Sequence, residues 1–165
     1  MMYLVKILGF ALLFTTAAQA LTNFNNAPSG AHYAKGSGEP VCTLSGLTVT
    51  CTGTNIQGVG NTNVNILLTV DATFTGVCHN PGNENVIDQF TESGPTTTEA
   101  IASSSKNGRL DVPAQSATAS SEQFLETFEC PNPNWTPEVT DVEVTSFEYT
   151  VTFEGFDEPA ITVSG

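Results

Sequence analysis

The sequence predicts an all-β protein, an Ig-like antiparallel β-sandwich of about seven to eight strands that is held by two disulfides. Strict alternation of apolar and polar residues over Val64–Cys78 is typical of a strand with one buried face. No window shows helical periodicity, and clusters of Gly, Asn and Pro separate several shorter alternating runs. The four cysteines can link such strands covalently.

The Val64–Cys78 segment predicts the central strand of the fold. Its inward phase comprises Val64, Ile66, Leu68, Val70, Ala72, Phe74, Gly76 and Cys78. A fully extended strand of this length would measure roughly 50 Å, well beyond the usual strand of about 3–10 residues. We therefore expect it to bend or bulge, and Gly76–Val77 is the expected place because glycine weakens a strand.

The start of the chain predicts a signal peptide over residues 1–20. Lys6 supplies the positive charge, residues 7–14 the apolar segment, and Ala18-Gln19-Ala20 a small-x-small cleavage site, so that Leu21 becomes the first residue. The apolar run is shorter than the roughly 18 residues needed to span a membrane. We expect a secreted, extracellular protein with no membrane span.

The chain is strongly acidic, with a formal charge of −13 that becomes −14 when the leader takes Lys6 away. Such a surface repels nucleic-acid phosphate and anionic lipid headgroups, so we expect neither as a partner. It favours cationic partners or divalent ions. A solvated acidic surface adapted to salt explains the charge without any binding site.

Four cysteines in an exported chain predict two disulfides, for which three pairings are possible. Cys42 and Cys51 flank a segment with a Ser45-Gly46 turn, so they can face each other across a tight hairpin. Cys78 and Cys130 then pair by elimination and join two strand ends that are distant in sequence.

The remaining elements follow in order along the chain. Residues 21–40 predict a flexible N-terminal arm, and the β-sandwich domain is expected over 41–165. Asn107-Gly108 predicts a type I′ hairpin turn between the edge-type strands 96–105 and 109–117.

The C-terminal third contains a change of phase. Residues 124–130 alternate like a further strand. Val142 and Val144 are apolar at even positions, whereas Phe147 and the apolar residues after it occupy odd positions. The shift at Thr145-Ser146 predicts a β-bulge or a strand that changes sheets.

Several segments together resemble a known group of proteins. They are GVGNTNVNILLTVDATFTGVC, SGP, SKNGRLDV and FECPNPNWTPEVTDVEVTSFEYTV, within Gly58–Val151. They are similar to a group of small secreted all-β proteins of bacteria and filamentous fungi that has no assigned activity. The resemblance implies a secreted all-β fold and supports the pairing of Cys78 with Cys130.

The residues predict no catalytic site. Cys78-His79 is a neighbouring pair whose cysteine we expect in a disulfide, and the chain holds only one other histidine and no GxSxG motif. Hydrolysis of glycosides needs paired carboxylates in a cleft. Asp141, Glu143 and Glu148 instead fall on the solvent-facing phase of their strand.

One loop contains several oxygen ligands of the kind that calcium prefers, although such loops are commonly simple turns. These weak metal candidates are Asn80, Asn83, Glu84 and Asp88. Their spacing does not match an EF-hand. A second acidic group, interpreted as a charged turn, comprises Glu154, Asp157 and Glu158.

These observations favour a secreted, non-enzymatic protein, structural or partner-binding, that acts as a monomer on an extracellular protein or surface. Two alternatives remain open: a calcium-stabilised extracellular module, and a small secreted hydrolase that uses surface carboxylates. A buried carboxylate in a cleft would favour the hydrolase, and an oxygen cage in the Asn80–Asp88 loop would favour the calcium module.

Overall fold

The computed structural model describes residues 17–82, 86–105 and 107–165, and this part of the chain is all-β. A short 3-10 turn, η1 (Phe24–Asn26), and one helix, α1 (Ser121–Leu125), interrupt the strands. The described residues form eleven strands: β1 (Ala17–Thr22), β2 (His32–Tyr33), β3 (Val41–Ser45), β4 (Thr48–Cys51), β5 (Thr54–Gln57), β6 (Val64–His79), β7 (Val86–Ala102), β8 (Leu110–Val112), β9 (Gln115–Thr118), β10 (Thr136–Phe153) and β11 (Ile161–Ser164).

Two antiparallel sheets enclose the core. Eight strands share one sheet in the order β7-β6-β10-β11-β1-β3-β4-β9, and β2-β5-β8 form a smaller sheet. The large sheet curls back on itself, because its last strand, β9, contacts β6 and β7 near the opposite edge. The all-β class is confirmed, but the expected seven to eight strands are too few and this strand order is not that of two Ig-like sheets. Alternation shows which residues face a core, not which strands share a sheet.

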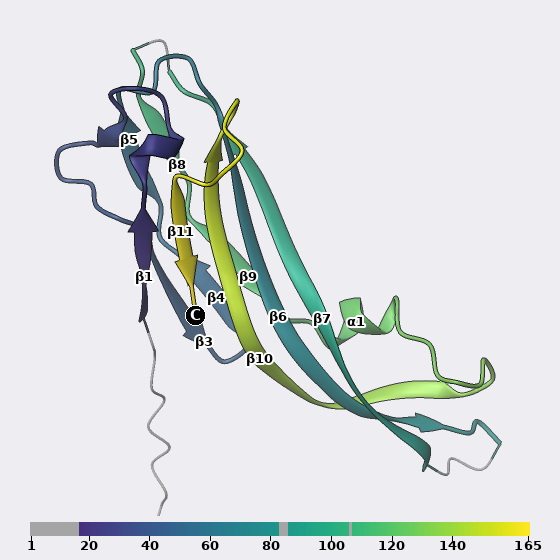
Figure 1. Cartoon of the computed structure of the whole chain (residues 1–165). Helices are drawn as coiled ribbons and strands as arrows, with labels where there is room; N and C mark the ends of the chain where they lie inside the picture. Colours follow the sequence, from purple (N-terminus) through teal and green to yellow (C-terminus); the bar gives the residue numbers. More distant parts are fainter. Residues whose placement is uncertain (1–16, 83–85, 106) are drawn as a thin grey trace, which may run out of the picture.

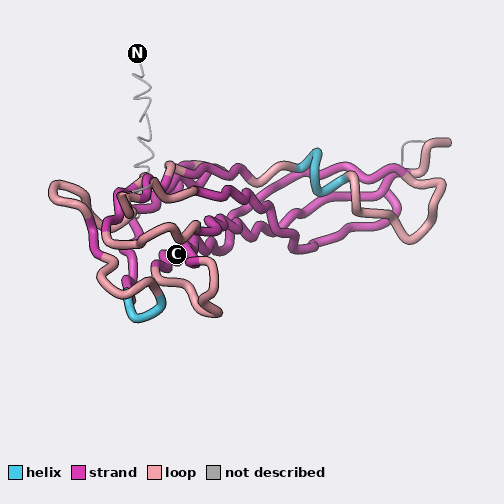
Figure 2. Tube along the Cα trace, turned by 90° about the horizontal axis from the view of Figure 1, so that it is seen from above, coloured by secondary structure: helices cyan, strands magenta, loops and turns pink. Residues whose placement is uncertain are grey.

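Three long strands, β6, β7 and β10, lie next to one another at one side of the large sheet. They pair along their whole length, with β6 in the middle. Figures 1 and 2 show them leaving the body of the molecule as a narrow extension. We call this extension the distal arm and define it as residues 72–79, 86–94 and 136–144, which the pairing places side by side.

The prediction for the central strand is confirmed. Burial alternates without interruption along β6, with the even-numbered side chains inside. The predicted irregularity in β10 is confirmed between Val144 and Ser146, and a second one lies between Val139 and Asp141. At each shift a threonine hydroxyl of β10 donates to a β6 carbonyl: Thr140 to the oxygen of Thr75 at 3.0 Å, and Thr145 to that of Asp71 at 3.2 Å.

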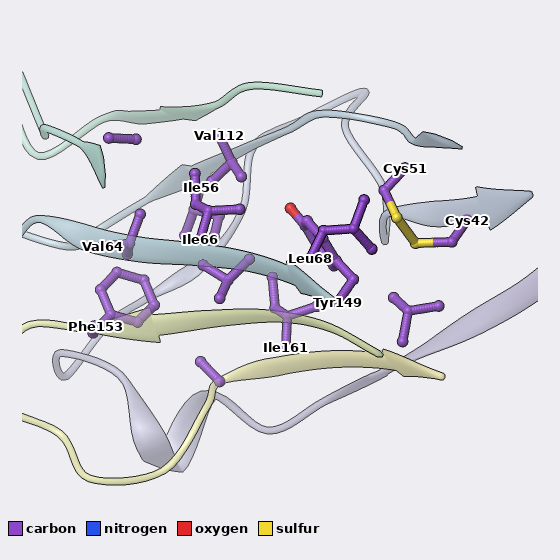
Figure 3. Packing of buried hydrophobic residues seen from close by; sticks show 14 of the residues in the cluster. Cys42, Cys51, Ile56, Val64, Ile66, Leu68, Val112, Tyr149, Phe153 and Ile161 are labelled. Atoms are coloured by element: carbon purple, nitrogen blue, oxygen red, sulfur yellow. A yellow bond between two sulfur atoms is a disulfide. The ribbon is translucent and has the colours of Figure 1, made fainter. Parts of the chain in front are cut away.

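The main core lies between the curled sheet and the small sheet. Figure 3 shows Ile56 and Val112 of the small sheet close to Ile66, Leu68 and Tyr149 of the long strands. All of these side chains are at most 3 % exposed. The core therefore joins strands from both ends of the described chain.

A separate phenylalanine cluster fills the inner face of the distal arm. The rings of Phe74 and Phe124 stack with centroids 4.2 Å apart, and Phe90 and Phe128 are also 4.2 Å apart. A Cβ at Gly76 would collide with the Phe90 ring and with a backbone carbonyl of β10. Gly76 is thus explained by this close packing.

The strand expected over residues 124–130 is wrong, because this part of the chain begins with α1. Ser120 caps the helix, since its hydroxyl accepts a hydrogen bond from the amide of Gln123 at 3.4 Å. The helix places Phe124 over the strands of the distal arm. Five helical residues are too few to show a periodicity in sequence.

The Asn107-Gly108 turn forms, but the hairpin does not. Gly108 has a φ of 72°, and its amide donates to the carbonyl of Ser105 at 2.9 Å. However, β7 pairs with β6, whereas β8 pairs with β5 in the small sheet. The prediction of two paired strands was wrong because a turn sequence specifies the reversal and not the sheet that each strand joins.

Residues 21–40, expected as a flexible arm, have specific partners in the structure. The Asn23 amide donates to the carbonyl of Ala160 at 2.8 Å, and the Asn26 side chain donates to that of Pro159 at 3.0 Å. The hydroxyl groups of Tyr33 and Thr22 lie 2.7 Å apart, and β2 pairs with β5. The segment thereby links β11 to the small sheet.

Both predicted disulfides are present. Cys42–Cys51 joins paired residues of the β3–β4 hairpin, and Cys78–Cys130 joins the end of β6 to the segment that follows α1. All four cysteines are at most 8 % exposed. The first disulfide therefore staples a local hairpin, and the second holds the cover of the distal arm onto its strands.

Removal of Cys78–Cys130 by paired Cys→Ala substitutions should destabilise the fold more than removal of Cys42–Cys51. The sequence separations are 52 and 9 residues, so the chain-entropy model gives roughly 4 and 3 kcal/mol, respectively. Urea unfolding of the two double variants measures both costs. An equal or reversed order would contradict this assignment.

Tyr149 should make the protein sensitive to alkaline pH. Its side chain is fully buried, and its hydroxyl has no hydrogen-bond partner among the described residues. Burial, with a smaller contribution from Tyr33, raises the pKa of Tyr149 from 10.0 to about 12. Because the pKa of Tyr149 is higher in the folded state than in the unfolded state, its contribution to the free energy of unfolding is fully present below pH 10. That free energy falls by up to about 3 kcal/mol as the pH rises toward 12, where the unfolded state releases the proton first.

The Tyr149→Phe variant should lose this part of the alkaline dependence and gain up to about 1 kcal/mol at pH 7, because it removes an unsatisfied buried hydroxyl. Tyr33→Phe is the matched control. It loses the contact with Thr22 and should be destabilised by about 1 kcal/mol. Urea unfolding at pH 7 and pH 11 compares the two. Marked destabilisation of Tyr149→Phe at pH 7 would show that the hydroxyl is satisfied.

Candidate functional site

The loop proposed for calcium is only partly described. Asn83 and Glu84 lie outside the described residues. The side-chain oxygen of Asn80 accepts a hydrogen bond from the Gly82 amide at 3.0 Å, and that of Asp88 accepts one from the Gln89 amide at 2.9 Å. No group of three potential metal ligands from His, Cys, Asp and Glu occurs within the described ranges. The two described candidates thus take part in local backbone hydrogen bonds.

His79 and Glu138 are joined by a hydrogen bond at the far end of the distal arm. The His79 Nε2 atom lies 2.7 Å from a carboxylate oxygen of Glu138 across the β6–β10 pair. An open cleft of about 670 Å³ adjoins the pair and is lined also by Pro81 and Pro137. The neighbouring Cys78 is held in its disulfide and provides no nucleophile. The pair links two strands next to the disulfide.

The carboxylates proposed for hydrolysis remain on the surface. Asp141, Glu143 and Glu148 are exposed along β10, as their phase predicted. Three other exposed carboxylates line a cleft of about 300 Å³ on the distal arm: Asp88, Glu92 and Glu129. None of the carboxylates in the described segments is buried.

A different cleft, of about 430 Å³, lies at the opposite end of the long strands from the distal arm, where β6 begins and β7 and β10 end. Asn65 pairs with Ile101 of β7 and with Thr152 of β10, so the three residues form a row on the outer face of the sheet. The turn at Glu154–Phe156 borders this row. We call this site the outer-face cleft; it is lined by Asn63, Val64, Asn65, Ile101, Thr152, Phe153, Glu154, Gly155 and Phe156.

Backbone and side-chain contacts hold the rim of the outer-face cleft in place. The Glu154 amide donates to the carbonyl of Asn63 at 2.9 Å, and the Asn63 side-chain amide donates to the Glu154 carboxylate at 3.2 Å. Gly155 has a φ of 85°, and the Phe156 amide closes the turn onto the Phe153 carbonyl at 3.1 Å. The carboxylate is therefore positioned beside an apolar wall.

Ile101 distinguishes the outer-face cleft from the rest of this surface. Its side chain is 74 % exposed, whereas its outward-facing neighbours on β7 are mainly Thr, Ser, Gln and Glu. The lining contains a carboxylate, two asparagine side chains and a threonine hydroxyl, and no Lys or Arg of the described residues belongs to it. This chemistry suits an apolar group that lies next to a positive charge.

The sequence interpretation missed this site. Residues 96–105 were expected to form an edge-type strand of small side chains, and Glu154 was assigned to a charged turn. The available indication was a large apolar residue, Ile101, on the outward phase of a polar strand. Its meaning depends on the pairing of β7 with β6, which brings Ile101 beside Asn65.

Comparison of the chain with protein-family models, with curated proteins and with solved structures finds no match. Neither helix in the described ranges is long and apolar enough to cross a membrane. The outer-face cleft is therefore interpreted from its own geometry.

The large negative charge should make stability depend on ionic strength rather than on calcium itself. With 17 carboxylates against four Lys and Arg residues, screening of self-repulsion should raise the melting temperature by several degrees in molar salt. Thermal melts in sodium chloride and calcium chloride at matched ionic strength should coincide. An extra rise in calcium that the Asp88→Asn variant loses would instead establish a calcium site in the Asn80–Asp88 loop.

Proposed function

We propose that the protein is a secreted, non-enzymatic binding protein that acts as a monomer. Its outer-face cleft binds an extracellular partner by accepting an apolar group next to a positive charge. The exposed Ile101 side chain at the positioned Glu154 carboxylate carries this proposal. Fully burying an isoleucine side chain contributes about 1.5–3 kcal/mol, so covering it is a substantial driving force for binding.

The charge of the molecule supports a cationic partner. The formal charge of −13 attracts positively charged groups at long range and increases association rates at low salt. Exposed Asp157 and Glu158 lie in the same segment as Glu154 and strengthen the negative potential near the cleft. The long-range attraction thus increases the rate of association, and the short-range apolar contact contributes to the affinity.

The frame supports a binding role in an oxidising environment. Both disulfides suit a protein outside the cytosol. We further propose that, as in Ig-like sandwiches, a stiff β framework presents a site built from strand ends and a turn. Pre-positioning of this kind lowers the entropic cost of binding.

The test uses dansylcadaverine, a fluorescent probe with an apolar ring system and one ammonium group. Wild-type protein should bind it saturably and increase its emission. The Ile101→Asp variant should reduce affinity more than about tenfold by removing the apolar contact, and Glu154→Gln should reduce it roughly fivefold by removing the charge. Glu143→Gln, which makes the same chemical change on β10 outside the cleft lining, is the matched control and should bind like wild type.

Neutral dansylamide separates the charge contribution from the apolar one. It should bind more weakly than dansylcadaverine to wild type, and equally to wild type and Glu154→Gln. If both probes bind equally, or if Ile101→Asp leaves binding unchanged, the outer-face cleft is not the binding site. Circular dichroism of each variant establishes that the fold is intact.

A further inference from the structure

Strand β1 fills a gap in the large sheet with two short pairings. Its first half, Ala17–Gln19, pairs with Val41–Thr43 of β3. Its second half, Ala20–Thr22, pairs with Ile161–Val163 of β11. Figure 1 shows β1 near both strands, and the order of the sheet places it between them. Without the first half, no strand in the described part of the chain would pair with this edge of β3.

The inward-facing positions of β1 carry small side chains, Ala18 and Ala20, which are partly buried. Ala18 lies opposite Cys42 and Ala20 lies opposite Val163, and both of these partners are fully buried. Both alanines pack against the main core. A Cβ on Gly165 would lie 3.5 Å from that of Ala18, so Gly165 lies against the gap on another side. Larger residues at these two positions would overpack the core.

The expected cleavage of the leader after Ala20 would remove the first half of β1. Leu21 and Thr22 would remain, and they could not shift into the gap, because the Asn23 amide is bonded to the Ala160 carbonyl at 2.8 Å. The exposed segment of β3, Val41–Thr43, carries no charged side chain. Unpaired strand edges without protecting charges are templates for another strand.

We propose that the gap between β3 and β11 is an acceptor site for an extended strand of another protein, with small side chains at two alternate positions. In the full chain, residues 17–20 occupy this gap, and their alternating alanines indicate the size of side chain that it would accept. A second copy of this chain is disfavoured as the occupant, because two molecules with a charge near −14 repel each other. The inference rests on the export assumed in the proposed function, but not on the outer-face cleft.

The test begins with the full chain, which is expressed with its own leader and exported. Its intact mass should correspond to a protein that begins at Leu21. A fluorescein-labelled, capped peptide with the sequence of residues 15–20, TTAAQA, is the probe. It should bind saturably, slow amide hydrogen exchange at Val41–Thr43, and raise the melting temperature by roughly 5–10 °C at about 100 times its Kd.

Two controls make the result specific. A peptide with Phe in place of Ala18 should not bind, because the gap has no room for the ring. A protein variant with a second Ala-Ala-Gln-Ala inserted before Leu21, whose mass shows that it retains the insert, should occupy its own gap and not bind the peptide. The Ile101→Asp variant should bind the peptide like wild type, so failure of the outer-face cleft would leave this result intact.

The proposal is overturned if the exported protein retains residues 17–20, because the gap is then permanently filled. It is also overturned if a protein that begins at Leu21 does not bind the peptide, or binds the Phe-containing peptide equally well. Protection of amides elsewhere, with none at Val41–Thr43, would likewise contradict it.

Discussion

The fold depends on the pairing of β6 with β7 on one side and β10 on the other. Because β6 alternates without a break, this pairing commits its even-numbered face to the interior over its whole length, together with the residues of β7 and β10 that lie opposite. The other strands of the large sheet continue from β10 through β11, and the small sheet covers the core that results. A slip of one residue would turn Ile66 and Leu68 toward solvent, so the hydrophobic effect fixes the register.

The same pairing divides the molecule into two regions, the body and the distal arm, whose apolar faces are covered in different ways. In the body, the curled sheet and the small sheet bury a common core. The distal arm has no second sheet, and its inner face is covered instead by α1, by the phenylalanine cluster and by the segment tied down through Cys78–Cys130. Exposure of this apolar face to water would cost free energy, and the disulfide stabilises the segment that covers it.

Each proposed binding region departs from the usual pattern of a β-sheet, in which apolar side chains are buried and interior strands are paired on both sides. On the outer face, a polar surface includes one large exposed apolar residue, Ile101, next to a positioned carboxylate. In β1, the pairing along β3 is complete only while residues 17–19 lie beside Val41–Thr43. The first is a deviation in burial and the second in strand pairing. The two regions lie on different strands, so binding at one does not require binding at the other.

The sequence by itself determined the features that depend on local spacing. The alternation of β6, the Cys42–Cys51 hairpin, the bulge after Val144 and, by elimination, the Cys78–Cys130 link all follow from a short pattern or a count. Only the tertiary structure decided that eight strands share one sheet, that β7 and β8 join different sheets after a turn, and that Ile101 lines one cleft with Asn65 and Glu154. These features depend on which distant edges pair, and a periodicity of two residues specifies a buried face without naming the partner.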